Sequence, residues 1–273
     1  MTLGELNRQI ITSLTPAIGQ REAYQTARLL LEDDLAVTPT KLLLNADRVL
    51  EPETEIRFRS YIKRILDGEP PQYVVGKAHF MGLTLDVNPA TLIPRPETAE
   101  LVDLVCDYAK DKKDLSILDV GTGSGCIAIA LARAIPFPQI TAIDSSQEAI
   151  QTAQQNAQNL SLKIDFKIAD INTFKGAFDI VVSNPPYIAQ SEKADMEPRV
   201  TMHEPASALF VPDSDPLIFY KAIIRNCSAK AYFFEINPLF EQQIIQLLQA
   251  HDLKAQIILD SFGKKRFAEA FSQ

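Results

Sequence analysis

The residues of this 273-residue chain that most clearly suggest chemistry are Asn184, Pro185, Pro186 and Tyr187, which directly follow the apolar run 178–183. Two consecutive prolines remove two backbone N–H donors and fix two φ angles, so this loop is stiff and rich in hydrogen-bond acceptors. The Asn184 side-chain oxygen and the Pro185 carbonyl could each accept one hydrogen of a planar NH2 group, and the Tyr187 ring could lie against its plane. The alternative is an ordinary turn that ends a strand, because Asn-Pro and Pro-Pro are common there.

A glycine-rich loop joins the apolar run 115–120 to a helical pattern at 126–134. Its residues are Gly121, Thr122, Gly123, Ser124 and Gly125. Glycines let a backbone approach a ligand closely, and a helix N-terminus offers free N–H groups to a carboxylate or phosphate. The spacing G-x-G-x-G after Asp119 is one residue shorter than the dinucleotide fingerprint. It is typical of S-adenosylmethionine sites more than of nicotinamide sites.

Two acidic residues end the next predicted strands. Asp144 lies roughly twenty residues beyond the glycines, where a carboxylate accepts from the ribose hydroxyls of either cofactor. Asp170 could accept from an adenine amino group, with Ile171 against the ring. Either carboxylate could instead only cap the segment that follows it.

Elements that would position these residues are predicted from about residue 92 onward, where strand and helix patterns alternate. The apolar runs are 115–120, 139–143, 163–168, 178–183, 231–236 and 255–259. This order predicts an α/β fold with a doubly wound, mostly parallel sheet covered on both faces, to which 266–271 would add an antiparallel edge strand. The glycine loop and the Asn-Pro-Pro-Tyr loop then meet at the carboxyl ends of the strands, beside the switch-point crevice.

The N-terminal part has a different pattern, because leucines and isoleucines recur there at three- and four-residue spacing. This spacing predicts a small helical domain whose last helix begins at Pro52 and ends before Gly68. Alternation at 83–87 predicts a strand of a hairpin. The predicted domains are a helical domain at 1–75, a linking β-hairpin at 76–91 and an α/β domain at 92–273.

Composition excludes several classes of function. A net charge of −8 and a pI near 5.0 argue against a surface built to hold nucleic acid. Three scattered cysteines are typical of reduced cytosolic thiols. The charged N-terminus and the lack of a membrane-length apolar run predict a soluble, cytoplasmic protein. The three histidines have no metal-ligand spacing, so we expect no metal site.

At four stretches the chain resembles a known family, the PrmC/HemK glutamine methyltransferases of peptide-chain release factors, within the class I methyltransferases that use S-adenosylmethionine. The stretches are 92–98, 118–125, 182–188 and 204–209. The resemblance spans nearly the whole chain. It implies a Rossmann-like fold, S-adenosylmethionine as cofactor, and a helical domain that helps to hold the release factor while the Asn-Pro-Pro-Tyr loop holds the glutamine of its Gly-Gly-Gln motif.

The resemblance also implies roles for individual residues. Catalytic roles fall to Asn184, Pro185 and Tyr187. The predicted cofactor contacts are Gly121, Thr122, Gly123, Ser124, Gly125, Asp144, Asp170, Ile171 and Asn184. The predicted substrate contacts are Asn184, Pro185, Pro186, Tyr187, Arg95 and Glu97. Prolines on both sides of Arg95 would fix its side chain in space, although 94–97 could instead only cap a helix that begins near Pro96.

Three features depart from the family pattern. The segment 210–216 replaces a glycine-rich turn, Asn237 stands where a glycine often follows, and Ile171 stands where many relatives have an aromatic residue. The first two bear on loop geometry. The third bears on what packs against the adenine, since the chain has no tryptophan.

The mechanism that we expect is attack of a glutamine amide nitrogen on the cofactor's methyl group, in a monomeric enzyme. An alternative is an adenine or guanine amino methyltransferase of nucleic acid, because a nucleobase NH2 poses the same geometric problem. A catalytically silent cofactor-binding protein is a third class. The acidic charge argues against the second class, and the intact Asn184 and glycine loop argue against the third.

Overall fold

The computed structural model describes residues 1–272, which form two compact units. The first unit consists of Met1–Lys77 and Glu197–His203. The second consists of Ala78–Met196 and the described chain from Glu204 onward. Each unit has its own hydrophobic core.

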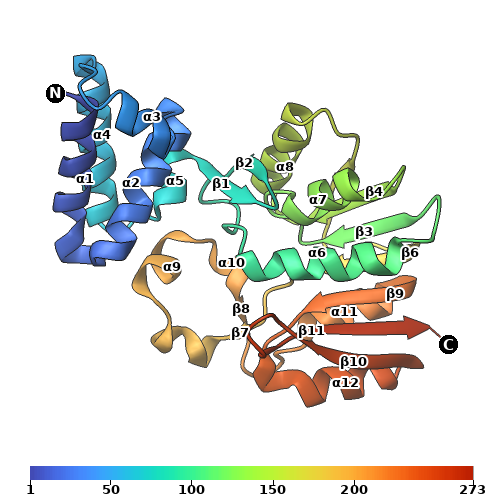
Figure 1. Ribbon diagram of the computed structural model, residues 1–273. Helices are drawn as coiled ribbons and strands as arrows, with labels where there is room; N and C mark the ends of the chain where they lie inside the picture. The colour runs from blue at the N-terminus through green and yellow to red at the C-terminus, as the bar shows by residue number, and fades with distance from the viewer. Residues whose placement is uncertain (273) are drawn as a thin grey trace. The chain divides into compact units, whose positions relative to one another are not determined.

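The first unit is helical (Figure 1). Its helices are α1 (Leu3–Ile18), α2 (Gln20–Leu35), α3 (Pro39–Leu44), α4 (Pro52–Leu66), α5 (Pro71–Val75) and α9 (Pro198–His203). Helix α1 starts with a capping box, in which the Glu5 N–H donates to Thr2 Oγ1 at 3.2 Å and the Thr2 N–H donates to Glu5 Oε2 at 2.7 Å. The predicted end signals of α4 are confirmed: Pro52 is its first residue, and Gly68, with a φ of +97°, follows its end.

Helix α9 belongs to this unit although it lies far along the chain. Arg199 forms an ion pair with Glu22 of α2 and a second with Glu197.

The spacing predicted for the apolar residues of α1 is confirmed by their burial, since Leu3, Leu6, Ile10 and Leu14 all lie in the core.

The second unit is built around a seven-stranded sheet of order β10-β11-β9-β6-β3-β4-β5. Its strands are β3 (Ser116–Val120), β4 (Gln139–Asp144), β5 (Asp165–Ile168), β6 (Gly176–Ser183), β9 (Cys227–Glu235), β10 (Leu253–Leu259) and β11 (Lys265–Ser272). Its helices are α6 (Pro96–Ala109), α7 (Cys126–Ala134), α8 (Gln147–Asn159), α10 (Ala206–Leu209), α11 (Ile218–Asn226) and α12 (Glu241–Gln249). Smaller elements are β1 (Lys77–Phe80), β2 (Leu83–Asp86), β7 (Ile188–Ala189), β8 (Phe210–Val211) and the 3₁₀ turns η1 (Gln190–Asp195) and η2 (Pro238–Phe240).

The predicted α/β class and the mostly parallel sheet are confirmed, but the predicted place of the last strand is wrong. Strand β11 is antiparallel to both neighbours, as expected for its direction, yet it lies between β9 and β10 and not at the edge. The edge strand on that side of the sheet is β10. The physical reason is burial on both faces of β11. Phe267 lies in one hydrophobic cluster together with residues of α6, and Ala268 and Ala270 lie in another cluster on the opposite face. A strand with two apolar faces buries more apolar surface inside the sheet than at its edge.

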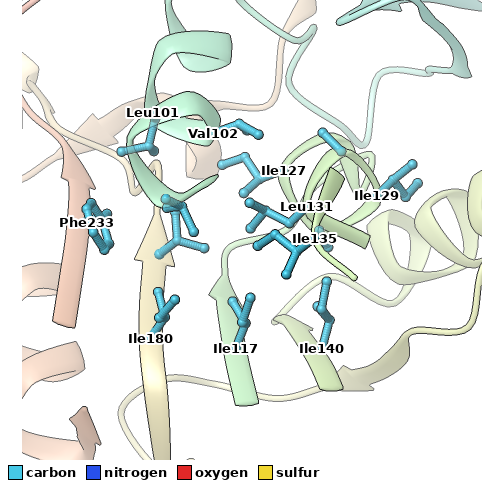
Figure 2. Close-up of a cluster of buried hydrophobic side chains, with 14 of the residues drawn as sticks. Leu101, Val102, Ile117, Ile127, Ile129, Leu131, Ile135, Ile140, Ile180 and Phe233 are labelled. Carbon is cyan, nitrogen blue, oxygen red and sulfur yellow. The ribbon is translucent and has the colours of Figure 1, made fainter. Parts of the chain in front are cut away.

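Two hydrophobic clusters cover the two faces of the sheet. Figure 2 shows the first, where side chains of α6 and α7 meet the sheet; the strands supply Ile117, Ile140, Ile180 and Phe233. The second cluster packs α11 and α12 against the side chains that alternate with these, such as Leu118 and Val181. Burial on both faces explains why the parallel strands are continuous apolar runs in the sequence.

The β1–β2 hairpin also contributes to the first cluster. Its turn residues Met81 and Gly82 have φ of 49° and 73°, the left-handed values of a two-residue hairpin turn. Phe80, Leu83 and Leu85 are buried against the α/β core. The hairpin that the sequence predicts as a linker therefore supplies part of the core of the second unit.

Replacement of Phe233 by alanine should destabilise the second unit strongly. This ring is 1% exposed and contacts Tyr108 and Phe271, with ring centroids 5.6 and 6.1 Å away. We expect a loss of about 3–5 kcal/mol in the free energy of unfolding, measured by urea denaturation. The control Phe262→Ala removes a ring that is 79% exposed and should change stability by less than about 0.5 kcal/mol. Equal effects of the two variants would contradict this account of the core.

Candidate active site

A cavity of about 230 Å³ lies at the carboxyl ends of β3, β4 and β6. The chain passes from β3 to β4 and β5 on one side and then places β6 on the other side of β3. This reversal of strand order leaves a crevice above β3, because the crossovers on its two sides run in opposite directions. The walls come from the loops after these strands, the segment before α6, and helices α10 and α11.

The glycine loop lines this cavity with its backbone. Gly121, Gly123 and Gly125 have left-handed φ of 74°, 57° and 83°. At the first two, an added Cβ would meet no atom within 4 Å, so the backbone faces open space. At Gly125 it would come within 3.0 Å of Ile129 and 3.1 Å of Ala153. The first two glycines thus leave room for a ligand, and the third allows α7 and α8 to pack closely.

Hydrogen bonds from the loop's N–H groups to acceptors on β4 hold the loop in place. The N–H groups of Gly121 and Thr122 both donate to the Ile143 carbonyl, at 2.9 and 3.0 Å. Asp144 accepts from the Gly123 N–H at 3.0 Å through one oxygen and from the Ser146 N–H at 2.9 Å through the other. Each carboxylate oxygen keeps a further lone pair for a ligand. Asp144 therefore both caps the turn before α8 and supports the glycine loop.

Asp119 lies beneath this loop and is fully buried. Its Oδ2 accepts from Thr122 Oγ1 at 2.6 Å and from the Ala128 N–H at 3.2 Å. Its Oδ1 and the hydroxyl of Ser124 are buried without a partner among residues 1–272. Burial raises the pKa of Asp119 to about 7, and the hydrogen bonds from Thr122 and Ala128 only partly oppose this.

The Asn184 side chain reaches the same cavity from the end of β6. The Ser183 hydroxyl donates to the Val120 carbonyl at 2.7 Å and so joins the ends of β6 and β3. Asn184 Nδ2 donates to Thr98 Oγ1 at 3.1 Å, and Thr98 donates to Glu235 Oε2 at 2.8 Å. The Tyr187 hydroxyl donates to the other oxygen of Glu235 at 2.9 Å.

An ion pair fixes the segment before α6. Arg95 Nη2 lies 2.6 Å from Glu204 Oε1, and Glu204 Oε2 accepts from the Ile93 N–H at 3.2 Å. Only 1% of the Glu204 side chain is exposed, so its charge depends on Arg95 for compensation. Helix α6 begins at Pro96, as the sequence predicts. Arg95 therefore precedes the helix and is held by Glu204.

Most of the predicted site residues lie on the cavity wall, and three do not. The wall includes Gly121, Thr122, Gly123, Ser124, Asp144, Asp170, Ile171, Asn184, Pro185, Pro186 and Arg95. Gly125, Tyr187 and Glu97 are not among the lining residues. Tyr187 is half-buried behind the loop, against the core under α11. Asp170 is exposed, and its Oδ1 accepts from the Asn172 N–H at 2.8 Å, so it also caps the following turn.

Several lining residues were not predicted. They are Ala90, Leu92, Pro94, Thr98, Ser145, Ser146, Pro205, Ser207, Ala208, Phe219 and Ile223, with further residues of the strand ends and of α7. Phe219 of α11 is the one aromatic side chain on the wall within residues 1–272. Helical periodicity at 218–226 indicates a buried face, but nothing local indicates that this face meets the cavity.

The two loops that depart from the family pattern are held by polar side chains. Asn237 has φ of −80°, which needs no glycine, and its Nδ2 donates to Glu192 Oε1 at 2.9 Å and to the Tyr187 carbonyl at 3.2 Å. In the segment 210–216, Phe210 and Val211 form β8, which pairs with β7. Asp213 then accepts from the Ser191 N–H at 2.9 Å. Side-chain hydrogen bonds thus take the place of glycine conformations.

Residues 1–272 contain no group of three His, Cys, Asp or Glu side chains arranged to hold a metal ion. In the same part of the chain, no helix combines the length and apolar character needed to cross a membrane.

Comparison with known proteins connects this geometry to a family. The model of a methyltransferase domain matches residues 111–255, and that of the PrmC N-terminal domain matches residues 7–76. The release factor glutamine methyltransferase of Bacteroides thetaiotaomicron is 37% identical over 98% of this chain and 99% of the relative. The chain belongs to the release factor glutamine methyltransferase family. A second member, from Flavobacterium psychrophilum, is 35% identical over 97% of this chain and 98% of that relative.

Solved structures support the fold of this family member. The catalytic domain of hMettl16, solved in complex with the MAT2A 3′UTR hairpin 6, has a TM-score of 0.54 at 17% identity and covers 81% of this chain and 82% of that one. The 16S rRNA N2 G1207 methyltransferase RsmC of T. thermophilus, solved with AdoMet and guanosine, has a TM-score of 0.53 at 16% identity and covers 72% of this chain and 50% of that one. At this identity, the likeness establishes a shared methyltransferase fold.

Replacement of Asp119 by asparagine should stabilise the protein more as the pH rises. The folded-state pKa is raised to about 7 from an ordinary value of 3.8, so the unfolded state loses this proton first. The free energy of unfolding of the wild type, relative to that of the variant, therefore falls as the pH rises from 3.8 to about 7, and it levels off above pH 7. The gain should be a few kcal/mol at most, since one pKa unit corresponds to about 1.4 kcal/mol. Urea denaturation of both proteins across this range would measure it, and a difference that does not vary with pH would contradict it.

Proposed function

We propose that this protein transfers a methyl group from S-adenosylmethionine to the side-chain amide nitrogen of the glutamine in the Gly-Gly-Gln motif of peptide-chain release factors. The observation that carries the proposal is the placement of the Asn184 amide and the glycine loop on one cavity wall. Membership of the family supports the substrate, because the full-length relatives are named release factor glutamine methyltransferases.

The cavity fits the cofactor. The open space at Gly121 and Gly123 is a cradle that any Cβ would occupy. Asp144 keeps free lone pairs for ribose hydroxyls, and Ile171 and Phe219 offer apolar surface for an adenine ring. When bound, S-adenosylmethionine supplies an electrophilic methyl group on a sulfonium. We assign its binding to these residues, with Asp170 toward the adenine amino group.

The protein's task is to make an amide nitrogen nucleophilic. The lone pair of an amide nitrogen is delocalised into its carbonyl, so orientation decides whether it can react. Asn184 Oδ1 has no donor among residues 1–272, and Pro185 lines the same wall. The two oxygens would accept the two hydrogens of the glutamine NH2, orient it, favour pyramidalisation and disperse the positive charge that develops on nitrogen.

No strong base is required before attack, because the nitrogen's proton becomes very acidic only after the methyl group has moved. Tyr187 does not serve as that base. Burial, followed by the charge of Glu235, raises the pKa of its hydroxyl well above its ordinary value. The hydroxyl therefore stays protonated and donates to Glu235, and water takes the proton from the product.

We assign the body of the release factor to the helical unit, which matches the PrmC N-terminal domain. The net charge of −8 supports a protein partner and not the phosphate backbone of a nucleic acid. We further infer a monomer that acts in the cytoplasm, where translation termination takes place.

Mass spectrometry of the Gly-Gly-Gln peptide tests the proposal after incubation of a full-length release factor with the protein and S-adenosylmethionine. One added methyl group on the glutamine, absent from a Gln→Ala release factor, is the expected result. A DNA and an RNA substrate are incubated in parallel. Methyl transfer to nucleic acid alone would overturn the proposal in favour of a nucleobase amino methyltransferase.

Replacement of Asn184 by alanine should lower kcat by about 10²- to 10³-fold, since it removes an acceptor aimed at the reacting group. The Kd for S-adenosylmethionine, from isothermal titration, should change by less than about threefold. The control Asn159→Ala changes an exposed asparagine at the end of α8 and should leave both values intact. Equal losses of turnover and cofactor affinity would contradict the role of Asn184.

A further inference from the structure

We propose that Glu235 and Thr98 are positioning residues that hold the Asn184 side chain with its oxygen, and not its NH2 group, toward the cavity. The inference rests on the proposed function and deepens it, because it explains why the site takes a hydrogen-bond donor. Thr98 ends the stretch 92–98 and Glu235 ends strand β9, but no sequence pattern assigns a role to either residue.

The Thr98 hydroxyl has a single hydrogen, so it can donate to only one of its two neighbours. Glu235 Oε2 lies 2.8 Å from Thr98 Oγ1, and a carboxylate oxygen can only accept. The hydroxyl must therefore donate to Glu235. It can then only accept from its other neighbour, which lies 3.1 Å away on Asn184. The atom of Asn184 that faces Thr98 must be Nδ2, so Oδ1 faces the other way.

The orientation of this amide decides what the cavity can bind. With Oδ1 outward, Asn184 accepts from an NH2 group. With Nδ2 outward, two NH2 groups would face each other and repel, and one acceptor would be lost. Glu235, Thr98 and Asn184 thus form a chain of two hydrogen bonds, which we call the relay. Through it, the negative charge of Glu235 makes the cavity present an acceptor to an amide donor.

The fold keeps Glu235 in place for this role. Phe234 is paired with Ser183 in the parallel β9–β6 ladder, so Glu235 and Asn184 follow at matching positions of adjacent strands. Glu235 is in turn paired with Phe267 of the inserted strand β11. Glu235 is 1% exposed, and its other carboxylate oxygen accepts from the Tyr187 hydroxyl.

Opposing effects act on the charge of Glu235, and burial is the largest of them. Burial raises the pKa of Glu235, while the hydrogen bonds from Thr98 and Tyr187 and the charge of Arg266 oppose the rise. Arg266 is itself paired with Asp260 at 3.2 Å, and Glu97 adds a like charge. Two hydroxyl donors and one nearby guanidinium are therefore the groups that allow a buried carboxylate at this position.

Glu235→Gln tests the relay with almost no change of shape. Tyr187 should keep donating to the glutamine oxygen, so the new NH2 donates to Thr98. The Thr98 hydrogen then turns to Asn184, which must present Oδ1 to Thr98 and Nδ2 to the substrate. We expect kcat for the release factor to fall about 10- to 100-fold, with KM and the Kd for S-adenosylmethionine within about threefold of the wild type.

A second substitution, at Asn184, should restore the hydrogen-bond acceptor that Glu235→Gln turns away from the substrate. Asn184→Asp has only acceptor oxygens, so in the Glu235→Gln background it accepts from Thr98 and still presents an acceptor to the substrate. The double variant should have at least fivefold higher kcat than Glu235→Gln, an effect on the order expected for one recovered hydrogen bond. Asn184→Asp alone should be poor, because two carboxylates then compete for one hydroxyl hydrogen. A double variant no more active than the weaker single variant would overturn the relay.

Thr98 provides an independent test with matched shapes. Thr98→Val removes the hydroxyl and should lower kcat. Thr98→Ser keeps a hydroxyl at the same position and should retain most of the wild-type kcat. The Tm of each variant is measured by calorimetry. Glu235→Gln removes a buried charge, so its Tm should not fall. Loss of activity that follows loss of Tm across all variants would indicate a merely structural role and overturn the proposal.

Failure of the relay and failure of the proposed function are distinguishable. Wild-type protein that methylates the release factor, together with a fully active Glu235→Gln variant, would overturn only the relay. Wild-type protein that methylates only a nucleobase NH2 would overturn the proposed function, and the same variants would then be assayed on that substrate.

Discussion

The pairing of β3 with β6 is the interaction on which the site depends. Val120 stands opposite Ser183 in this ladder, and the Ser183 hydroxyl donates to the Val120 carbonyl at 2.7 Å. The glycine loop begins one residue after the first and the Asn-Pro-Pro-Tyr loop one residue after the second. Because side chains alternate between faces, a slip of one residue would move each strand side chain into the opposite core, where its shape does not match its neighbours. Burial on both faces therefore fixes the register, and the register fixes the distance between the two loops.

The elements of the α/β unit could be predicted because buried parallel strands appear as apolar runs and glycines end them. Their order in the sheet could be predicted only in part. Strand β11 was expected at the edge, but nothing within 266–271 states which neighbours it will choose. That choice depends on side chains from distant helices that cover both of its faces.

Some residues of the candidate site could likewise be predicted from the sequence, and others could not. The residues of the two loops could be named because their types and spacing suggest chemistry by themselves. Thr98 and Glu235 could not, since their contact joins residues 137 positions apart and no sequence pattern gives either of them a role. Phe219 is a similar case, because a helical period shows that a face is buried but not what it faces. Departures such as Asn237 were visible in the sequence, yet only the structure shows how a polar side chain replaces a glycine there.

Strand β11 also determines when the site can be completed. It is the last element along the described chain, and its Phe267 stands opposite Glu235 within the sheet. A nascent chain emerges from the ribosome with its N-terminus first. The glycine loop and Asp144, which accepts from the Gly123 N–H, therefore emerge well before this strand does. During synthesis the cofactor cradle can therefore form first, whereas the surroundings that orient Asn184 are assembled only after residue 267 has emerged. A nascent chain would pass through a state with a cradle for the methyl donor and no ordered place for the acceptor.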